Sequence, residues 1–216
     1  MHDPEGRNQW RLAVVDDDAA VLRSLSRMLG ACGYAVSSYA SAEAFADSLT
    51  AEIPDALLVD LRLPGADGLT LLERLREQGH RIPTVFLSGH ADVPTSVRAI
   101  RAGAVDFLEK PCDESTLLTS LARACDVASH HRAEAASRDE IRAKWMSLTP
   151  REREVCTYVV QGRLNKQIAA LLGTTEKTIK VHRARVMVKM HAKSVAELVR
   201  LVDAVMTDTD SSARSP

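Results

Sequence analysis

The stretch WRLAVVDDDAAVL, residues 10–22, runs from apolar residues directly into three consecutive carboxylates and then becomes apolar again. Residues 12–15 have the length and β-branched content of a short buried strand. Asp16, Asp17 and Asp18 follow at once. We expect Asp18 to be the solvent-facing N-cap of the helix that comes next. Because like charges repel, the other two carboxylates mark the end of this strand as a candidate functional site.

Similar apolar runs recur through the first half of the chain and alternate with segments of helical period. The expected strands are LAVV, AVSSY, ALLVD, TVFLS and VDFLEK. Nearly continuous apolar runs are typical of strands that are buried on both faces. Between them, segments such as GLTLLERLREQG repeat apolar residues every three or four positions. Five strand–helix repeats predict an α/β domain, with a five-stranded parallel, doubly wound sheet and helices on both faces.

The expected helix ends carry residues that terminate or cap helices. Ser41 and Asp113 are candidate N-caps. Glycines fall where the helices should stop, at positions 30, 33, 79 and 103.

The second half of the chain has a different composition. Residues 126–147 are rich in Ala and in charged residues and contain no Pro or Gly, which predicts a helical linker that continues the fifth helix. Four further helices are expected within residues 148–206, and the polar segment 207–216 is expected to be a flexible tail. The predicted domains are therefore an α/β domain at residues 9–125 and an all-α domain at residues 148–206.

The overall net charge of −1 hides an asymmetry between the two halves. Residues 1–124 hold 12 Lys and Arg against 18 Asp and Glu, a net charge of −6. Residues 148–206 hold 11 against 5, a net charge of +6. An acidic domain favours cations, and a compact basic domain favours phosphates or nucleic acid.

Composition also indicates the cellular setting. The sequence contains no window of about 18 apolar residues, and MHDPEGRNQW lacks the pattern of a secretory signal, so we expect a cytoplasmic protein without a membrane partner. The four cysteines are scattered without a C-x-x-C pair, which predicts free buried thiols.

Polar residues follow four of the five expected strands. Asp16 and Asp17 follow the first strand, Asp60 ends the third, and Ser88 and Lys110 follow the fourth and fifth. In the common strand order 2-1-3-4-5 the first and third strands are neighbours, so the three carboxylates should converge. Two such charges about 4 Å apart repel by roughly 4 kcal/mol at an effective dielectric near 20. We therefore expect a divalent cation, and oxygen ligands favour Mg²⁺ (or Mn²⁺).

These groups together indicate phosphoryl chemistry. Asp60 would be the nucleophile and form an aspartyl phosphate. The metal ion would be held by Asp17 and, more weakly or through water, by Asp16, while Lys110 and Ser88 would compensate the remaining phosphoryl charge.

Four motifs in register resemble the receiver domain of two-component response regulators, which has the flavodoxin-like fold. They are VVDDD, LLVDLRLPGADGLTLL, LSGHADV and AGAVDFLEKP. The resemblance implies that a sensor histidine kinase phosphorylates Asp60. It implies metal contacts from Asp16, Asp17, Asp60 and the backbone carbonyl of Arg62. It also implies a cis peptide bond between Lys110 and Pro111.

Two positions depart from the commonest receiver pattern without removing its chemistry. Phe107 occupies the aromatic switch position, where other receivers often have Tyr, and Ser88 stands where many have Thr. His90, beside the site, is interpreted as a surface loop histidine rather than a catalytic base.

The basic half has the layout of a helix-turn-helix. A short helix is expected from about Asn165 to Leu172, a turn at Gly173, and a second helix from about Glu176 to Met190. Thr174 or Thr175 would cap the second helix. Its inward face would carry Ile179, Val186 and Met190, and its outward face Lys177, Lys180, Val181, Ala184 and Val188, with Arg185 on the flank. Cations and small apolar groups on one face are typical of a helix that binds the major groove of double-stranded DNA.

Residues 148–206 resemble the LuxR-type DNA-binding domain, so the whole chain resembles the NarL/FixJ class. By that resemblance Lys180 and Val181 read base edges, and the residues nearer the DNA backbone are Asn165, Lys166, Lys177 and Thr178. Some relatives have Lys where Ala184 stands, and Arg183 and Arg185 are candidates to take over part of its role. Glu154 is interpreted as structural, tying helix ends together.

The expected function is a phosphorylation-dependent transcriptional regulator and not an enzyme. A phosphoryl group on Asp60 would draw in Ser88, Phe107 would turn inward, and the face of the fourth helix and fifth strand would be remodelled. The phosphorylated form would be a homodimer that binds half-sites about one helical turn apart and contacts RNA polymerase.

Two alternatives stay open at this point. An aspartate-nucleophile phosphatase would share Asp60, Mg²⁺ and Lys110, but it needs a second acid positioned to protonate the leaving group and a substrate cap, and neither feature is evident in LRLPGADG. A constitutive DNA-binding protein would use its α/β domain only for dimerisation, and Asp60 would then take up no phosphate.

Overall fold

The computed structural model describes residues 10–49, 53–89 and 93–212 of the chain, with side chains up to residue 206. It divides into two compact units, residues 1–131 and 132–216. The first unit is built around a parallel sheet and the second is helical. Helix α5, Glu114–Met146, runs as one 33-residue helix from the first unit into the second. The segment expected to be a helical linker is part of this helix.

The sheet of the first unit has the predicted order β2-β1-β3-β4-β5, and all four strand pairs are parallel. Its strands are β1 Arg11–Val15, β2 Ala35–Tyr39, β3 Ala56–Asp60, β4 Thr84–Ser88 and β5 Asp106–Glu109. The register pairs Asp60 with Leu87 and Ser88 with Glu109. The carboxyl ends of the strands are therefore level with one another, and the residues that follow them meet at one edge.

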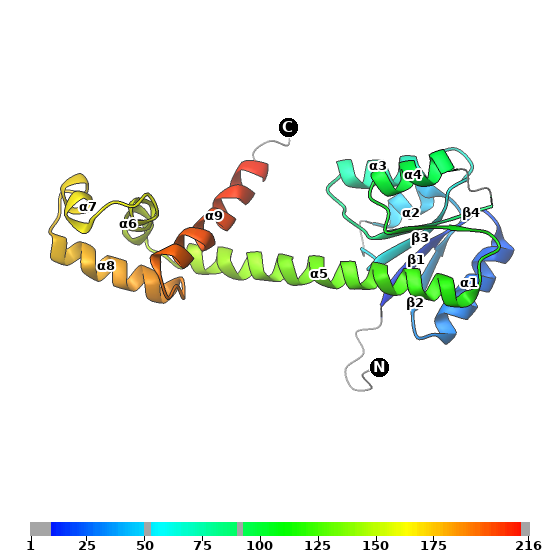
Figure 1. Cartoon of the computed structure of the whole chain (residues 1–216), viewed down its shortest axis with the longest axis horizontal. Helices are drawn as coiled ribbons and strands as arrows, with labels where there is room; N and C mark the ends of the chain where they lie inside the picture. Colours follow the sequence, from blue (N-terminus) through cyan, green and yellow to red (C-terminus); the bar gives the residue numbers. More distant parts are fainter. Residues whose placement is uncertain (1–9, 50–52, 90–92, 213–216) are drawn as a thin grey trace. The chain divides into compact units, whose positions relative to one another are not determined.

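Helices cover both faces of the sheet, because alternate strand residues point to opposite sides (Figure 1). The covering helices are α1 Ala19–Ala31, α2 Ala42–Ser48, α3 Gly68–Glu77, α4 Val93–Arg101 and the first part of α5. Leu57 and Phe86 point to the core under α2, α3 and α4. Leu12 and Leu58 point to the core under α1 and α5. The doubly wound fold predicted from the apolar runs is confirmed.

Most of the expected helix ends are found where the sequence places them. Asp18 caps α1 and accepts hydrogen bonds from Ala20 N and Val21 N at 2.7 and 3.3 Å. Ser41 caps α2. The glycines at 33, 79 and 103 have positive φ angles, which side chains of L-residues rarely adopt. Gly30 is the penultimate residue of α1, which ends at Ala31.

The second unit consists of the end of α5 and four further helices. They are α6 Pro150–Val160, α7 Asn165–Leu171, α8 Glu176–Lys189 and α9 Val195–Ser212. Their core includes Ile168, Ile179 and Leu198, all fully buried. Of the two candidate caps for α8, the structure uses Thr175, whose hydroxyl accepts from Thr178 N. Helix α9 continues beyond residue 206, where the sequence predicted the start of a tail.

All four cysteines are free thiols. Cys125 and Cys156 are buried as predicted, whereas Cys32 and Cys112 are only partly so. Burial raises the pKa of Cys156 to about 11, so this thiol is neutral at physiological pH. Within the ranges that the structure describes, no helix is both long enough and apolar enough to cross a lipid bilayer.

Candidate functional site

The structure brings three carboxylates together at the carboxyl edge of the sheet. Asp16 and Asp17 follow β1, and Asp60 ends the neighbouring strand β3. One oxygen of each carboxylate lies within 4.8 Å of the others. Asp16 is buried, Asp60 is half-buried and Asp17 is exposed. The cluster therefore has one solvent-facing side through which an ion or a phosphoryl group can approach.

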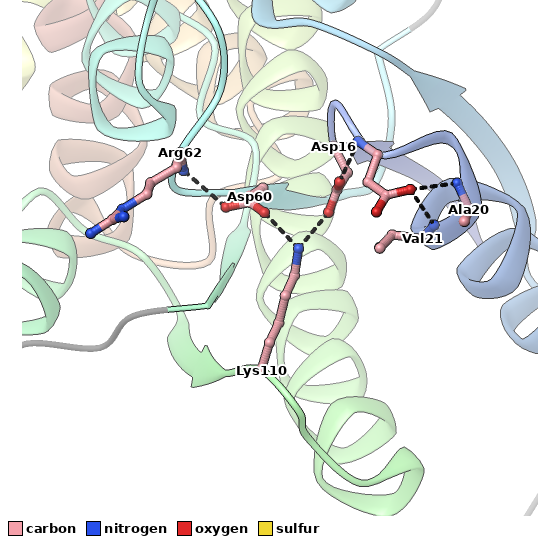
Figure 2. Close-up of polar contacts among 7 residues, drawn as sticks. Asp16, Ala20, Val21, Asp60, Arg62 and Lys110 are labelled. Carbon is pink, nitrogen blue, oxygen red and sulfur yellow. Dashed lines mark hydrogen bonds and ion pairs between the residues drawn. The ribbon is translucent and has the colours of Figure 1, made fainter.

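Lys110, which follows β5, joins two of these carboxylates. Figure 2 shows its ammonium group between Asp16 and Asp60, with Nζ 2.6 Å from Asp16 Oδ2 and 2.5 Å from Asp60 Oδ2. Burial by itself would lower the pKa of Lys110, but the hydrogen bonds and charges of the two carboxylates outweigh it and raise the pKa. The lysine is thus held in its charged form. The peptide bond between Lys110 and Pro111 is cis, as the resemblance implied.

The backbone orients the carboxylates. Asp60 Oδ1 accepts a hydrogen bond from Arg62 N at 2.9 Å, and Asp16 Oδ1 accepts one from Asp18 N at 2.9 Å. In both Asp16 and Asp60, one carboxylate oxygen therefore accepts from a backbone amide and the other accepts from Lys110. The side chain of Arg62 extends away from Asp60 (Figure 2). Only the backbone of Arg62 is thus in a position to contribute to the site.

The charge of the cluster fits a divalent cation. Lys110 already compensates one of the three carboxylate charges. Three carboxylates and one ammonium leave a net charge of −2. Asp16, Asp17 and Asp60 offer oxygen donors alone, which are the ligands that Mg²⁺ prefers. These residues could hold such an ion.

The two candidate switch residues lie on neighbouring strands. Ser88 ends β4 and is fully buried, and its carbonyl accepts a hydrogen bond from Lys110 N at 2.7 Å. Phe107 lies in β5 and is half-buried, with its ring centroid 6.4 Å from that of Phe86. His90 lies outside the described residues.

The helix-turn-helix of the second unit has the predicted inward face. Ile179, Val186 and Met190 are fully buried. The expected outward residues are exposed, namely Lys177, Lys180, Val181, Ala184, Arg185 and Val188. The solvent-exposed side of α8 therefore carries both cations and small apolar groups, as the sequence predicted.

Two of the predicted DNA contacts are bonded to each other. Arg183 Nη1 donates to Asn165 Oδ1 at 3.1 Å and so links α8 to the first residue of α7. The hydroxyl of Thr178 bonds that of Thr175 at the start of α8. Lys180 Nζ lies 3.7 Å from Glu176 Oε1. Lys166 is exposed on α7. Asn165 and Arg183 thus also have a structural role in fixing the two helices.

Sequence reasoning missed Glu152, which is the buried carboxylate of the second unit. Its side chain accepts from Thr149 N at 2.9 Å and from Lys189 Nζ at 2.7 Å. Lys189 and the Thr149 amide together lower the pKa of Glu152 to about 2. The Thr-x-x-Glu spacing of a capping box was the available signal, and it locates the start of α6 but not the partner on α8.

Glu154, which was expected to tie helix ends together, is exposed and has a lesser role. It pairs with Arg151 on its own helix at 2.8 Å. Arg151 in turn donates to the carbonyl of Leu172, at the end of α7, at 2.6 Å. Glu154 therefore acts on a helix end only through Arg151, whereas Glu152 joins two helices directly.

Two family models match the chain. Residues 12–122 match the response regulator receiver domain, and residues 146–202 match the bacterial regulatory proteins of the luxR family. The two matches follow the two units of the structure.

Named proteins and solved structures are similar over nearly the whole chain. The response regulator protein TmoT of Ectopseudomonas mendocina is 41% identical over 88% of this chain and 86% of its own length. The transcriptional regulatory protein FixJ of Bradyrhizobium diazoefficiens is 41% identical over 87% of this chain and 92% of its own. The structure of the response regulator StyR is 37% identical with a TM-score of 0.75, covering 90% of this chain and 98% of its own. Full-length FixJ from B. japonicum is 38% identical with a TM-score of 0.57, covering 93% and 99%.

Proposed function

The chain belongs to the NarL/FixJ class of response regulators, which are phosphorylation-dependent transcription regulators, and from that premise we propose that Asp60 is its phosphoacceptor. The observation that carries the proposal is the position of Asp60. Its carboxylate lies in a cluster with Asp16 and Asp17 and is bonded to Lys110. A receiver domain implies a sensor kinase as partner, and a LuxR-type domain implies DNA.

In the proposed reaction a carboxylate oxygen of Asp60 attacks the phosphorus of a phosphohistidine on the sensor kinase. The new O–P bond replaces the N–P bond, and the histidine leaves. Lys110 stabilises the charge on the phosphoryl oxygens, and Ser88 donates its hydroxyl to one of them. Mg²⁺ (or Mn²⁺), held by Asp16, Asp17, Asp60 and the carbonyl of Arg62, supplies further positive charge when bound.

The phosphoryl group then changes the surface of the receiver. Ser88 moves toward the phosphate and Phe107 turns inward, which remodels the face formed by α4 and β5. The half-buried position of Phe107 supports this role, since its ring packs against the core under α2, α3 and α4 without being fully enclosed. The remodelled face favours a homodimer.

The dimer presents two copies of α8 to the half-sites of a DNA operator. Lys180 and Val181 read base edges. The residues that lie toward the DNA backbone are Asn165, Lys166, Lys177 and Thr178. Arg183 and Arg185 add further DNA contacts. The protein acts in the cytoplasm, where the DNA-bound dimer contacts RNA polymerase. The chain acts as a regulator rather than as an enzyme. The acid in the loop after Asp60, Asp67, supports this because it caps α3, with its carboxylate 2.7 Å from Thr70 N.

Intact-mass spectrometry after incubation with acetyl phosphate and Mg²⁺ tests the proposal. We expect a gain of one phosphoryl group in the wild-type chain and none in Asp60→Asn. The absence of a gain in the wild type would favour the constitutive DNA-binding protein instead. Sedimentation of the same samples tests the switch, since an unchanged mass of the phosphorylated protein would reject dimerisation.

A further inference from the structure

The exposed side of α8 carries a line of apolar residues. This line extends one to two helical turns beyond Lys180 and Val181, the two residues proposed to read base edges. Val181, Ala184 and Val188 lie at spacings of three and four residues and so share one line along the helix. The exposed fractions of the two valines are 46% and 74%. Ala184 between them is also exposed.

The surroundings of Val188 leave its side chain accessible. A surface hollow beside it is lined by Ala184, Arg185 and Lys189 of α8 and by Thr149 and Glu152 of the neighbouring α6. Valine is a poor helix former, so a valine that faces solvent in a helix is intrinsically less favourable than the Lys, Arg or Ala found at its other exposed positions. The two exposed valines thus bring no benefit to the isolated helix.

The charges around the line restrict what can cover it. Lys177, Lys180 and Arg185 are exposed on the same side of α8, and residues 148–206 carry a net charge of +6. The partner must therefore be anionic and must also present small apolar groups between its charges. The major groove of DNA does so, because the C5-methyl groups of thymine lie on its floor between two rows of phosphates.

We propose that Ala184 and Val188 extend the specificity-determining face of α8 beyond Val181, and that this face reads the methyl groups of thymine. The inference rests on the proposed function, because it takes α8 to be the helix that enters the groove. From Val181 to Val188 the helix rises about 10 Å, which corresponds to about three base pairs along the groove. The operator half-site then holds two thymines about three base pairs apart.

The test selects binding sites for the full phosphorylated chain from a random double-stranded DNA library. Each thymine of the selected half-site is then replaced singly by deoxyuridine, which lacks only the methyl group. We expect two replacements about three base pairs apart to weaken binding about fourfold each, the effect of losing one buried methyl group. In Val188→Ala, one of these two replacements loses its effect, because the alanine side chain is too short to reach the thymine methyl group.

Leu171→Ala is the matched control, since Leu171 is another exposed apolar residue of this unit and lies on α7. In Leu171→Ala, each of the two deoxyuridine replacements should still weaken DNA binding. If the wild type selects a site but binds its deoxyuridine forms equally well, or if Val188→Ala retains both effects, the inference is overturned while the proposed function stands. If the phosphorylated wild type selects no site, the proposed function itself fails.

Discussion

Lys110 is the residue on which the carboxylate cluster depends most directly. One ammonium group donates to two carboxylates that belong to different strands. Charge-assisted hydrogen bonds of this kind are stronger than neutral ones, and each is worth roughly 1.5–3 kcal/mol. Asp16 is buried, so the loss of its partner leaves an uncompensated charge that water cannot fully solvate.

We predict that Lys110→Met lowers the free energy of unfolding of the first unit by about 2 kcal/mol in EDTA. Because the variant leaves three carboxylates uncompensated, millimolar Mg²⁺ should restore more of its stability than it adds to the wild type. Urea unfolding with and without Mg²⁺ measures both effects. Lys144→Met is the control, since Lys144 pairs with the exposed Glu140 and its loss should cost less than about 0.5 kcal/mol. Equal Mg²⁺ effects in wild type and Lys110→Met would contradict the prediction.

Gly68 begins α3 directly behind Asp60 at the end of β3, and there is no room for a side chain at this position. A Cβ atom at this position would lie 2.6 Å from the carbonyl oxygen of Asp60 and 3.0 Å from Phe86 Cε1. We predict that Gly68→Ala destabilises the first unit by about 2 kcal/mol or more, because backbone has to move.

Gly30 provides the matched substitution. It lies inside α1, its φ is not positive, and a Cβ atom at this position would have no neighbouring atom within 4 Å. Gly30→Ala should therefore stabilise the same unit by about 0.5–1 kcal/mol. Chemical denaturation of both variants in a Trp145→Phe background, followed by the fluorescence of Trp10, compares them. Equal effects of the two substitutions would show that the close approach at Gly68 is unimportant.

Among the secondary-structure elements, α6 and α8 share an apolar core and are also joined by an ion pair whose carboxylate is buried. Glu152 of α6 bonds Lys189 of α8 at 2.7 Å, and the same lysine donates to the carbonyl of Ser147 at 3.1 Å. This contact helps to set the position of α8 relative to the start of α6. It also couples the stability of the second unit to pH.

We predict that the second unit loses stability as the pH falls from about 4.5 to about 2. The pKa of Glu152 is depressed from its ordinary 4.5 to about 2. The unfolded chain therefore binds a proton before the folded one does, and the stabilisation that is present above pH 4.5 is lost below it. The loss attributable to this residue is about 3 kcal/mol.

Glu152→Gln should flatten this acid dependence, and Glu154→Gln should leave it unchanged because Glu154 makes only an exposed ion pair. The chain has two tryptophans, so Trp10→Phe leaves Trp145 as the reporter of the second unit. Unfolding curves between pH 2 and 7 measure the effect. An unchanged slope in Glu152→Gln would mean that other carboxylates cause the acid sensitivity.

For the chain as a whole, the two units have cores with no residue in common. Helix α5 contributes Leu121 to the first unit and Ile141 to the second, and no residue of its exposed middle, from residue 129 to residue 140, belongs to any of the cores. Each unit therefore has its own source of stability.

We predict two separate unfolding transitions for the full chain. Trp145→Phe leaves Trp10 to report the first unit, and Trp10→Phe leaves Trp145 to report the second. Adding Gly68→Ala should move the transition seen by Trp10 and leave the one seen by Trp145 in place, because the two cores are independent. A single transition that Gly68→Ala shifts at both reporters would show that the units unfold together.

Local patterns in the sequence were enough to obtain the elements, the strand order and the convergence of Asp16, Asp17 and Asp60. Apolar periodicity, caps such as Asp18, and the rule that parallel strands end at one edge all act over short distances or through topology. The same reasoning did not find Glu152, whose buried carboxylate joins α6 to α8.

The pairings of individual side chains emerged only once the chain was folded. Lys110 is 94 residues from Asp16, and Lys189 is 37 residues from Glu152. Whether such groups meet depends on how strands and helices are positioned and on which rotamers the surrounding residues allow, and neither leaves a periodic trace in the sequence. A charged side chain is buried only where a partner from another element reaches it, so its partner is a property of the folded chain.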